Sequence, residues 1–227
     1  MADSPPPRLL LVAHGTRSAA GSHTTARIAA AVAAARPGLR VDLCFLDVAE
    51  PTMSDALDDA PELATVVVPM LLSTGYHVQH DIPAATAGRP RVAVARHLGP
   101  HELLVDALAD RLISAGGEAG IPTVLLAAGS SRPEAGDEVA EAARMLGVRL
   151  GVDVTVRTVA GGLADLAVTG RDDAAAQIST YLLAEGQFTD HVQTAAAGAV
   201  VAGPIGTHPA LIALILSRYD DAGTPPG

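Results

Sequence analysis

The sequence predicts an α/β protein built from two tandem domains, each a parallel sheet flanked by helices. Short apolar runs, which are typical of buried strands, alternate along the chain with longer alanine- and leucine-rich stretches that are typical of helices. Strands separated by helices pair in parallel, so this order indicates doubly wound sheets. The order occurs twice, on either side of a glycine-rich linker at 115–120. We therefore expect one domain over residues 1–115 and a second over residues 121–227.

The first half contains four predicted strands, because four short runs are rich in branched apolar residues. These runs are Arg8–Ala13, Val41–Phe45, Val66–Met70 and Val92–Ala95. The expected helices are Thr24–Ala35, with Ser22 or His23 near its start, a helix that ends at Ala60, Asp81–Ala87 and His101–Ser114. In the second of these helices Pro51 suits the first position, which makes Glu50 the expected N-cap.

The second half repeats this order with fewer clear strands. The strands expected there are Val124–Ala127, Val152–Val156 and Val200–Ala202, and the helices are Gly136–Leu150, Asp172–Ala184 and Pro209–Tyr219. Short segments also recur at a nearly constant spacing: 12–17 with 127–132, 71–77 with 182–188, and 98–101 with 205–208. Such recurrence indicates a duplicated fold.

The second copy lacks polar residues that the first copy has. It has Gly129 for His14, Phe188 for His77 and Gly161 for Glu50. A duplicated fold that keeps its glycines and loses one set of polar side chains predicts a single site, carried by the first half.

Composition excludes several classes of protein. A net charge of −10 and a chain with two phenylalanines, three tyrosines and no tryptophan argue against a nucleic-acid partner. No apolar run reaches the roughly 18 residues of a membrane span, and Met1–Pro5 lacks the features of a signal peptide, so we expect a cytoplasmic protein. Cys44 is the only cysteine, which excludes an internal disulfide and any cysteine-based zinc or iron–sulfur site.

Three residues with acid–base and metal-binding chemistry follow the predicted strands of the first half. His14 follows the first strand, Glu50 the second, and His77 follows the third after a short loop. Ligands of parallel sheets bind beyond the carboxyl ends of the strands, where these residues would converge. Two imidazoles and a carboxylate suit a divalent first-row metal ion and can also accept protons. The alternative is that each is an ordinary loop residue; the joint loss of all three in the copy favours function.

Other histidines carry weaker signals. His77 and His80 are spaced so that they could share a metal on a helix, although an exposed helix face is the simpler interpretation for His80. His101 and His208 recur in both halves at helix starts, which indicates a structural task such as capping. His23 could face the site, while His97 and His191 have no context that indicates a role. The chain has no nucleophile elbow at 129–132 and no glycine-rich phosphate fingerprint, which disfavours hydrolases and nucleotide enzymes.

Three segments, 10–17, 45–51 and 68–83, resemble the signature blocks of the class II chelatases of the sirohydrochlorin type, and the resemblance spans essentially the whole chain. It implies two domains that face each other across a cleft, with a planar tetrapyrrole between them. It makes His14 a metal ligand and proton acceptor, His77 a second metal ligand, and Glu50 a group that contacts metal or substrate. The loop that would line the macrocycle consists of Leu72, Ser73, Thr74, Gly75 and Tyr76.

The resemblance implies insertion of a divalent metal into sirohydrochlorin, with Fe²⁺ for siroheme as the first choice. The alternatives are Co²⁺ insertion on the cobalamin route and a non-catalytic carrier of tetrapyrrole or metal. No cofactor is expected beyond the substrate metal ion, Fe²⁺ or Co²⁺. The expected partners are the tetrapyrrole and that ion, with no nucleic acid and no membrane. Because the duplication lets one chain form the cleft, we expect a monomer.

Overall fold

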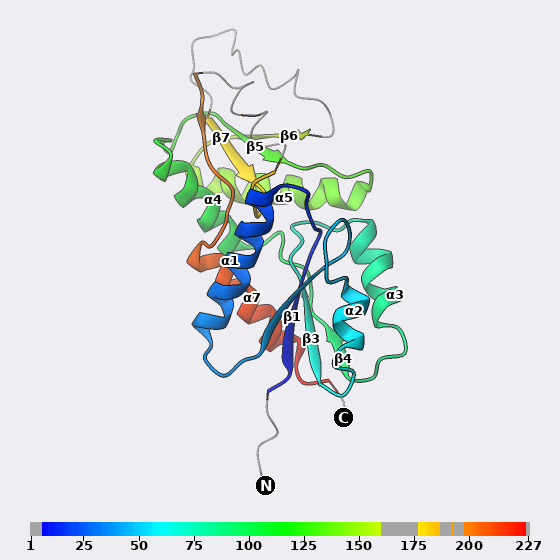
Figure 1. The fold of residues 1–227 in the computed structure, drawn as a ribbon. Helices are drawn as coiled ribbons and strands as arrows, with labels where there is room; N and C mark the ends of the chain where they lie inside the picture. Colours follow the sequence, from blue (N-terminus) through cyan, green and yellow to red (C-terminus); the bar gives the residue numbers. More distant parts are fainter. Residues whose placement is uncertain (1–5, 160–176, 187–191, 193–197, 226–227) are drawn as a thin grey trace.

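The structure, a computed structural model, describes residues 6–159, 177–186, 192 and 198–225. The described residues form two four-stranded parallel sheets, one in each half (Figure 1). The first sheet has the order β2-β1-β3-β4 and the second has the order β6-β5-β7-β8. The two orders are equivalent, so the halves share one topology, and the predicted fold class is confirmed.

The strands of the first sheet are β1 (Arg8–Ala13), β2 (Val41–Phe45), β3 (Thr65–Pro69) and β4 (Val92–Val94). Those of the second sheet are β5 (Thr123–Ala127), β6 (Val154–Thr158), β7 (Gln177–Tyr181) and β8 (Val200–Val201). Every residue of β1, β3, β5 and β7 is buried, as expected for the inner strands of parallel sheets covered on both faces.

The helices cover these sheets. They are α1 (Ala19–Ala35), α2 (Met53–Asp58), a π-helical turn η1 (His77–Asp81), α3 (Ile82–Thr86), α4 (Glu102–Ser114), α5 (Pro133–Leu150) and α7 (Pro209–Ala222). No helix in the described part of the chain is long and apolar enough to cross a membrane. The predicted boundaries agree with the observed ones to within three residues, except at the starts of α1 and α2 and in the predicted helix Asp172–Ala184.

Two helix starts differ from the sequence prediction. The first helix begins at Ala19 rather than Thr24, because the Ser18 hydroxyl accepts a hydrogen bond from the Gly21 amide and caps it. The expected N-cap role of Glu50 is wrong: α2 begins at Met53, and Glu50 precedes a cis peptide bond to Pro51 outside the helix. Thr52 is the cap there, in a capping box with Asp55 that satisfies two backbone amides.

The predicted helix Asp172–Ala184 is also wrong. Residues 177–181 form β7, which pairs with β5 on one side and β8 on the other. The alanines at 174–176 suggested a helix, but those residues lie outside the described part. Ile178, Thr180 and Tyr181 favour strands, and their central place in the second sheet buries them completely.

The last helix of each half packs on the other half. Helix α4 packs against β7 and α5, whereas α7 packs against β3 and α1. Two equivalent arginines bind each of these helices to the other half. Arg111 on α4 donates to the Ile205 carbonyl at 2.8 and 3.1 Å, and Arg218 on α7 donates to the Leu98 carbonyl at 3.4 Å. One apolar cluster therefore runs through both halves. The domain boundary at 115–121 stays a prediction, because each half packs its last helix on the sheet of the other half.

Candidate functional site

Two histidine side chains meet at the carboxyl edge of the first sheet. His14 follows β1 directly, and His77 follows β3 after a short loop. The two Nε2 atoms lie 3.1 Å apart, and the rings meet edge to face with centroids 4.6 Å apart. A divalent ion about 2.1 Å from both nitrogens would make an angle of about 95° at the metal, which first-row ions accept. The pair can therefore hold a metal ion at two points or share a proton.

The backbone after β1 fixes the position of His14. The Leu46 and Asp47 amides donate to the Ala13 and His14 carbonyls at 2.9 and 3.0 Å, so the pairing with β2 continues past the strand end. Gly15 follows with a φ of 96°, and a Cβ atom there would lie 1.9 Å from the Asp47 carbonyl oxygen. Only glycine allows this approach, which turns the chain sharply after His14.

The π-helical turn η1 positions His77. The Ile82 amide donates to the His77 carbonyl, which widens the turn by one residue relative to an α-helix. Within this turn Nδ1 of His77 lies 2.5 Å from Oδ2 of Asp81. A carboxylate that accepts the Nδ1 proton leaves the Nε2 lone pair free and directed toward His14. Asp81 thus selects the tautomer that a metal ligand needs.

Glu50 is not joined to this pair. Its side chain is exposed, and among the described residues no hydrogen bond or ion pair connects it with either histidine. Consistently, the described part of the chain contains no group of three metal-binding side chains. The structure thus brings together two of the three predicted site residues, and the role of Glu50 stays a prediction.

The predicted substrate loop, residues 72–76, adjoins the histidine pair. Its residues are half-buried except Tyr76, which is 56% exposed. The Tyr76 ring stacks on His80, with centroids 4.5 Å apart, and meets His77 edge to face. His80 therefore packs on Tyr76, and the imidazole nearest to His77 is that of His14. An exposed aromatic ring beside the pair offers an apolar face to a flat ligand.

The remaining histidines have other surroundings. His101 and His208 cap α4 and α7, because their Nδ1 atoms accept the Leu103 and Ala210 amides at 3.1 and 3.2 Å; the predicted capping is confirmed. His23 is exposed on α1, and no described contact joins it to the pair. His191 lies outside the described residues.

The second half has no imidazole at the matching position. Gly129 adopts a φ of 91°, as Gly15 does, so alignment by these two glycines places Ala128 opposite His14. The predicted match of Gly129 with His14 is thus shifted by one residue, since the loops after β1 (14–18) and after β5 (128–132) are equal in length and align residue by residue. Phe188 and Gly161, the expected counterparts of His77 and Glu50, lie outside the described residues.

Sequence reasoning missed several polar residues around the site. Asp81 stands four residues after His77, a spacing that signals contact on a helix. By contrast, Glu138 and Tyr181 reach the loop 72–76 from the second half. His97 is 7% exposed, and its Nε2 lies 3.2 Å from Oε1 of Glu138 without the alignment of a hydrogen bond. No sequence pattern links these residues with the loop.

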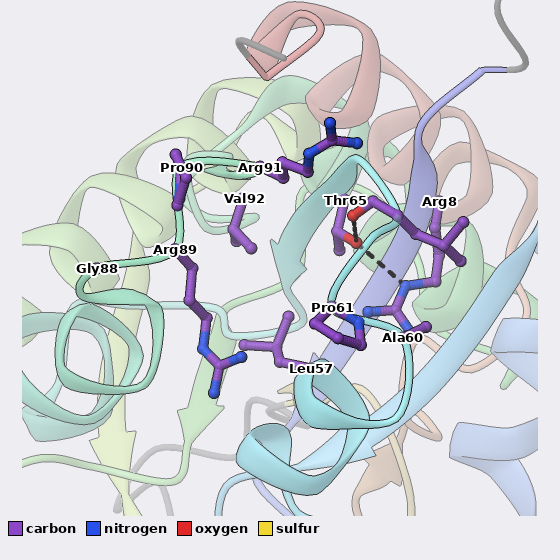
Figure 2. Close-up of a pocket in the computed structure, with 11 residues that line it drawn as sticks. Arg8, Leu57, Ala60, Pro61, Thr65, Gly88, Arg89, Pro90, Arg91 and Val92 are labelled. Carbon is purple, nitrogen blue, oxygen red and sulfur yellow. Dashed lines mark hydrogen bonds between the residues drawn. The ribbon is translucent and has the colours of Figure 1, made fainter.

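A separate pocket of about 380 Å³ opens at the opposite, amino edge of the first sheet (Figure 2). Three of its lining residues are arginines, and each donates to a main-chain carbonyl: Arg8 to Ala56, Arg89 to Ala85 and Arg91 to Glu62. Ala56 and Ala85 lie near helix ends, where free carbonyls attract cations. Local structure therefore accounts for these arginines, away from the histidine pair.

Two sequence comparisons cover the half that carries the histidines. The family model CbiX matches residues 8–115. The sirohydrochlorin cobaltochelatase of Methanococcoides burtonii is 28% identical over 120 aligned residues, and the match covers 45% of this chain and 92% of that protein.

Solved structures resemble the chain over nearly its whole length. SirB from Bacillus subtilis with Fe³⁺ has a TM-score of 0.75 at 23% identity and covers 96% of both chains. SirB from subspecies spizizenii in complex with cobalt has a TM-score of 0.76 at 22% identity, over 96% of this chain and 95% of that one. CbiX, described as the terminal enzyme for biosynthesis of siroheme in denitrifying bacteria, has a TM-score of 0.69 at 25% identity, over 95% of this chain and 99% of that one. The match of residues 8–115 to the CbiX model and the likeness of both halves to SirB and CbiX agree with the three sequence blocks, so the first half belongs to the CbiX family and the whole chain has the fold of the SirB and CbiX chelatases.

Proposed function

We propose that this protein inserts a divalent metal ion into sirohydrochlorin, with Fe²⁺ for siroheme as the physiological metal. The observation that carries the proposal is the pair of facing Nε2 atoms, 3.1 Å apart, on the half that matches the CbiX model. The pair adjoins a loop with an exposed tyrosine, which suits a flat macrocycle. Family membership supports the substrate, and the residues supply the chemistry.

The reaction requires that two pyrrole protons leave the macrocycle as the ion enters. Neutral imidazoles hold a first-row ion while remaining able to release it, whereas a thiolate would retain it. In our proposal His77, oriented by Asp81, keeps the ion at the edge of the sheet. His14 binds the same ion and accepts a pyrrole proton once the ion has passed to the ring. Glu50, exposed on the neighbouring loop, is the proposed contact for substrate or for the second proton.

The choice of Fe²⁺ rests on the relatives. The CbiX protein of siroheme biosynthesis covers 95% of this chain, whereas the cobaltochelatase covers 45%. Co²⁺ is the alternative, because SirB structures hold either Fe³⁺ or cobalt. Imidazole sites also bind Co²⁺ more tightly than Fe²⁺, so a preference for cobalt in purified protein does not identify the physiological metal.

The test is anaerobic incubation of substoichiometric protein with sirohydrochlorin and Fe²⁺ or Co²⁺, followed by the absorption change of the macrocycle. We expect many turnovers for the wild type and a loss of about 100-fold or more in His14→Ala and His77→Ala, because each removes a ligand or a proton acceptor. His23→Ala, an exposed histidine outside the pair, is the matched control and should keep full activity. Conversion that stops at one equivalent per chain would identify a carrier, and full activity in both site variants would refute the assignment.

A further inference from the structure

We propose that Glu138, on α5 of the second half, is a positioning residue that holds the loop 72–76 in the shape that receives the tetrapyrrole. This inference rests on the proposed function and extends it, because it gives the second half a specific task in substrate binding. Glu138 is distant in sequence from the loop and has no place in the three signature blocks. Figure 1 shows α5 between the second sheet and the first half, where it can reach the loop.

Both carboxylate oxygens of Glu138 bind the same residue of the loop. The Thr74 amide donates to Oε2 at 2.5 Å, and the Thr74 hydroxyl donates to Oε1 at 3.0 Å. Two charge-assisted bonds from one rigid helix fix both the main chain and the side chain of Thr74. His77, three residues further along, is fixed separately by the turn η1 and by Asp81, so this anchor acts on the loop itself.

A second bond from the same half fixes the start of the loop. The Tyr181 hydroxyl donates to the Leu72 carbonyl at 3.0 Å. Tyr181 is 2% exposed, and burial raises the pKa of its phenol, so the hydroxyl remains a donor. Gly99 makes room for the contact, because a Cβ atom there would lie 2.2 Å from both bonded oxygens. The loop is thus held from the second half at two points.

The duplicated fold repeats the Glu138 anchor with its partners reversed. At the equivalent interface the Thr24 hydroxyl on α1 donates to Oε2 of Glu185 at 2.5 Å. Here the helix supplies the threonine and the loop supplies the glutamate, and that loop, residues 182–186, contains no histidine. The two contacts join the halves with the same chemistry, but only the Glu138 contact adjoins the histidine pair. Glu185 therefore provides a matched control for Glu138.

The test compares Glu138→Ala with Glu185→Ala in steady-state insertion assays with sirohydrochlorin and Fe²⁺. We expect Glu138→Ala to raise KM for sirohydrochlorin by about 10-fold or more, the value of a lost charge-assisted bond, while kcat changes less than about threefold. Glu138→Gln, which keeps one acceptor oxygen, should recover part of this loss. Glu185→Ala should leave KM within about twofold of the wild type. An unchanged KM in Glu138→Ala, or equal increases in both alanine variants, would overturn the inference.

Two readouts without turnover separate this inference from the proposed function. The affinity for metal-free sirohydrochlorin, from fluorescence or absorption titration, should fall about 10-fold in Glu138→Ala and stay unchanged in Glu185→Ala. Co²⁺ binding to the histidine pair, followed by its visible absorption, should be the same in both variants. Hydrogen exchange of the Thr74 amide should become fast only in Glu138→Ala. If the wild type binds the macrocycle without inserting metal, the proposed function fails while these comparisons still test Glu138. If Glu138→Ala does not fold, Thr74→Val removes the hydroxyl bond alone and must weaken macrocycle binding, or the inference is wrong.

Discussion

At the residue scale the site depends on a short series of contacts that begins at Asp81. Its carboxylate lies 2.5 Å from Nδ1 of His77, and Nε2 of His77 faces Nε2 of His14 at 3.1 Å. A metal-binding histidine commonly donates its other ring proton to a carboxylate, which fixes the ring and raises its basicity. In the proposed site Asp81 would therefore act on the metal through His77, without being one of its ligands.

Asp81→Asn tests this contact. We expect metal affinity or insertion rate to fall about 10- to 100-fold, since an amide orients the ring less firmly than a carboxylate does. Stability should change little, because the Asp81 side chain is 40% exposed. Co²⁺ titration and the insertion assay measure the effect. Asp58→Asn, which disrupts an exposed ion pair with Arg89 away from the site, is the control and should behave as the wild type.

Buried histidines make stability depend on pH. Burial lowers the pKa of His97 and of His101 from the ordinary value of 6.5; for His97, Arg96 and Arg218 add to this effect and Glu138 opposes it. Between 6.5 and the lowered values the unfolded chain binds more protons than the folded chain. The contribution of these two histidines to the free energy of unfolding is therefore fully present above pH 6.5 and is lost as the pH drops through that value.

Urea unfolding at pH 7.5 and pH 5.5 checks this expectation. The wild type should unfold at a lower urea concentration at the lower pH, and His97→Gln should show a smaller difference between the two conditions. An unfolding midpoint that rises on acidification would contradict the assignment of His97 as a buried neutral side chain.

At the scale of elements, caps and strand ends place the functional residues. Helix α2 follows directly after the loop that contains Glu50, and its start is fixed by the Thr52 and Asp55 capping box. The bridge between Phe45 and Thr52 ties this start to the end of β2. The cap thus determines where the Glu50 loop ends.

Thr52→Ala should therefore lower the free energy of unfolding by about 1 kcal/mol, the usual cost of losing an N-cap. Chemical denaturation measures the change. Ser54→Ala, an exposed position in the same helix without a capping contact, is the control and should stay within about 0.5 kcal/mol of the wild type. Equal effects of both substitutions would show that the capping box contributes no stability.

At the scale of the whole molecule the halves are interlocked. The exchange of α4 and α7, with the reciprocal bonds of Arg111 and Arg218, means that each sheet is covered by a helix from the other half. Cross-half contacts also include the ion pair between Arg36 and Asp220. The arrangement resembles a symmetric dimer within one chain, which is why a monomer is the expected state of the full protein.

Residues 1–115 expressed alone test this arrangement. Without the second half, the face of the first sheet that α7 covers is exposed, and the equivalent helix α4 has no sheet to pack on. Two copies can cover both exposed sheet faces if each packs its α4 on the sheet of the other, so we expect a dimer. Sedimentation of the fragment beside the full chain provides the measurement. A stable monomeric fragment would show that α4 can fold back onto its own sheet.

The strands of the first half, the duplicated order and the two histidines that meet could be predicted from the amino-acid sequence. These features arise from local patterns: branched apolar runs specify buried strands, and residues after parallel strands gather at one edge. His14 and His77 could be singled out because each stands next to such a strand end, and Asp81 could have been, because its spacing from His77 is helical.

Other features emerge only when the whole chain is folded. They are strand β7, the packing of each half's last helix on the other half, and the anchoring of the loop 72–76. Residues 177–181 form a strand because β5 and β8 flank them, an influence that alanine-rich neighbours in the sequence conceal. Glu138 and Tyr181 reach the loop across 64 and 109 residues of chain. No local pattern encodes contacts at such separations, because they depend on how two whole sheets and their exchanged helices pack.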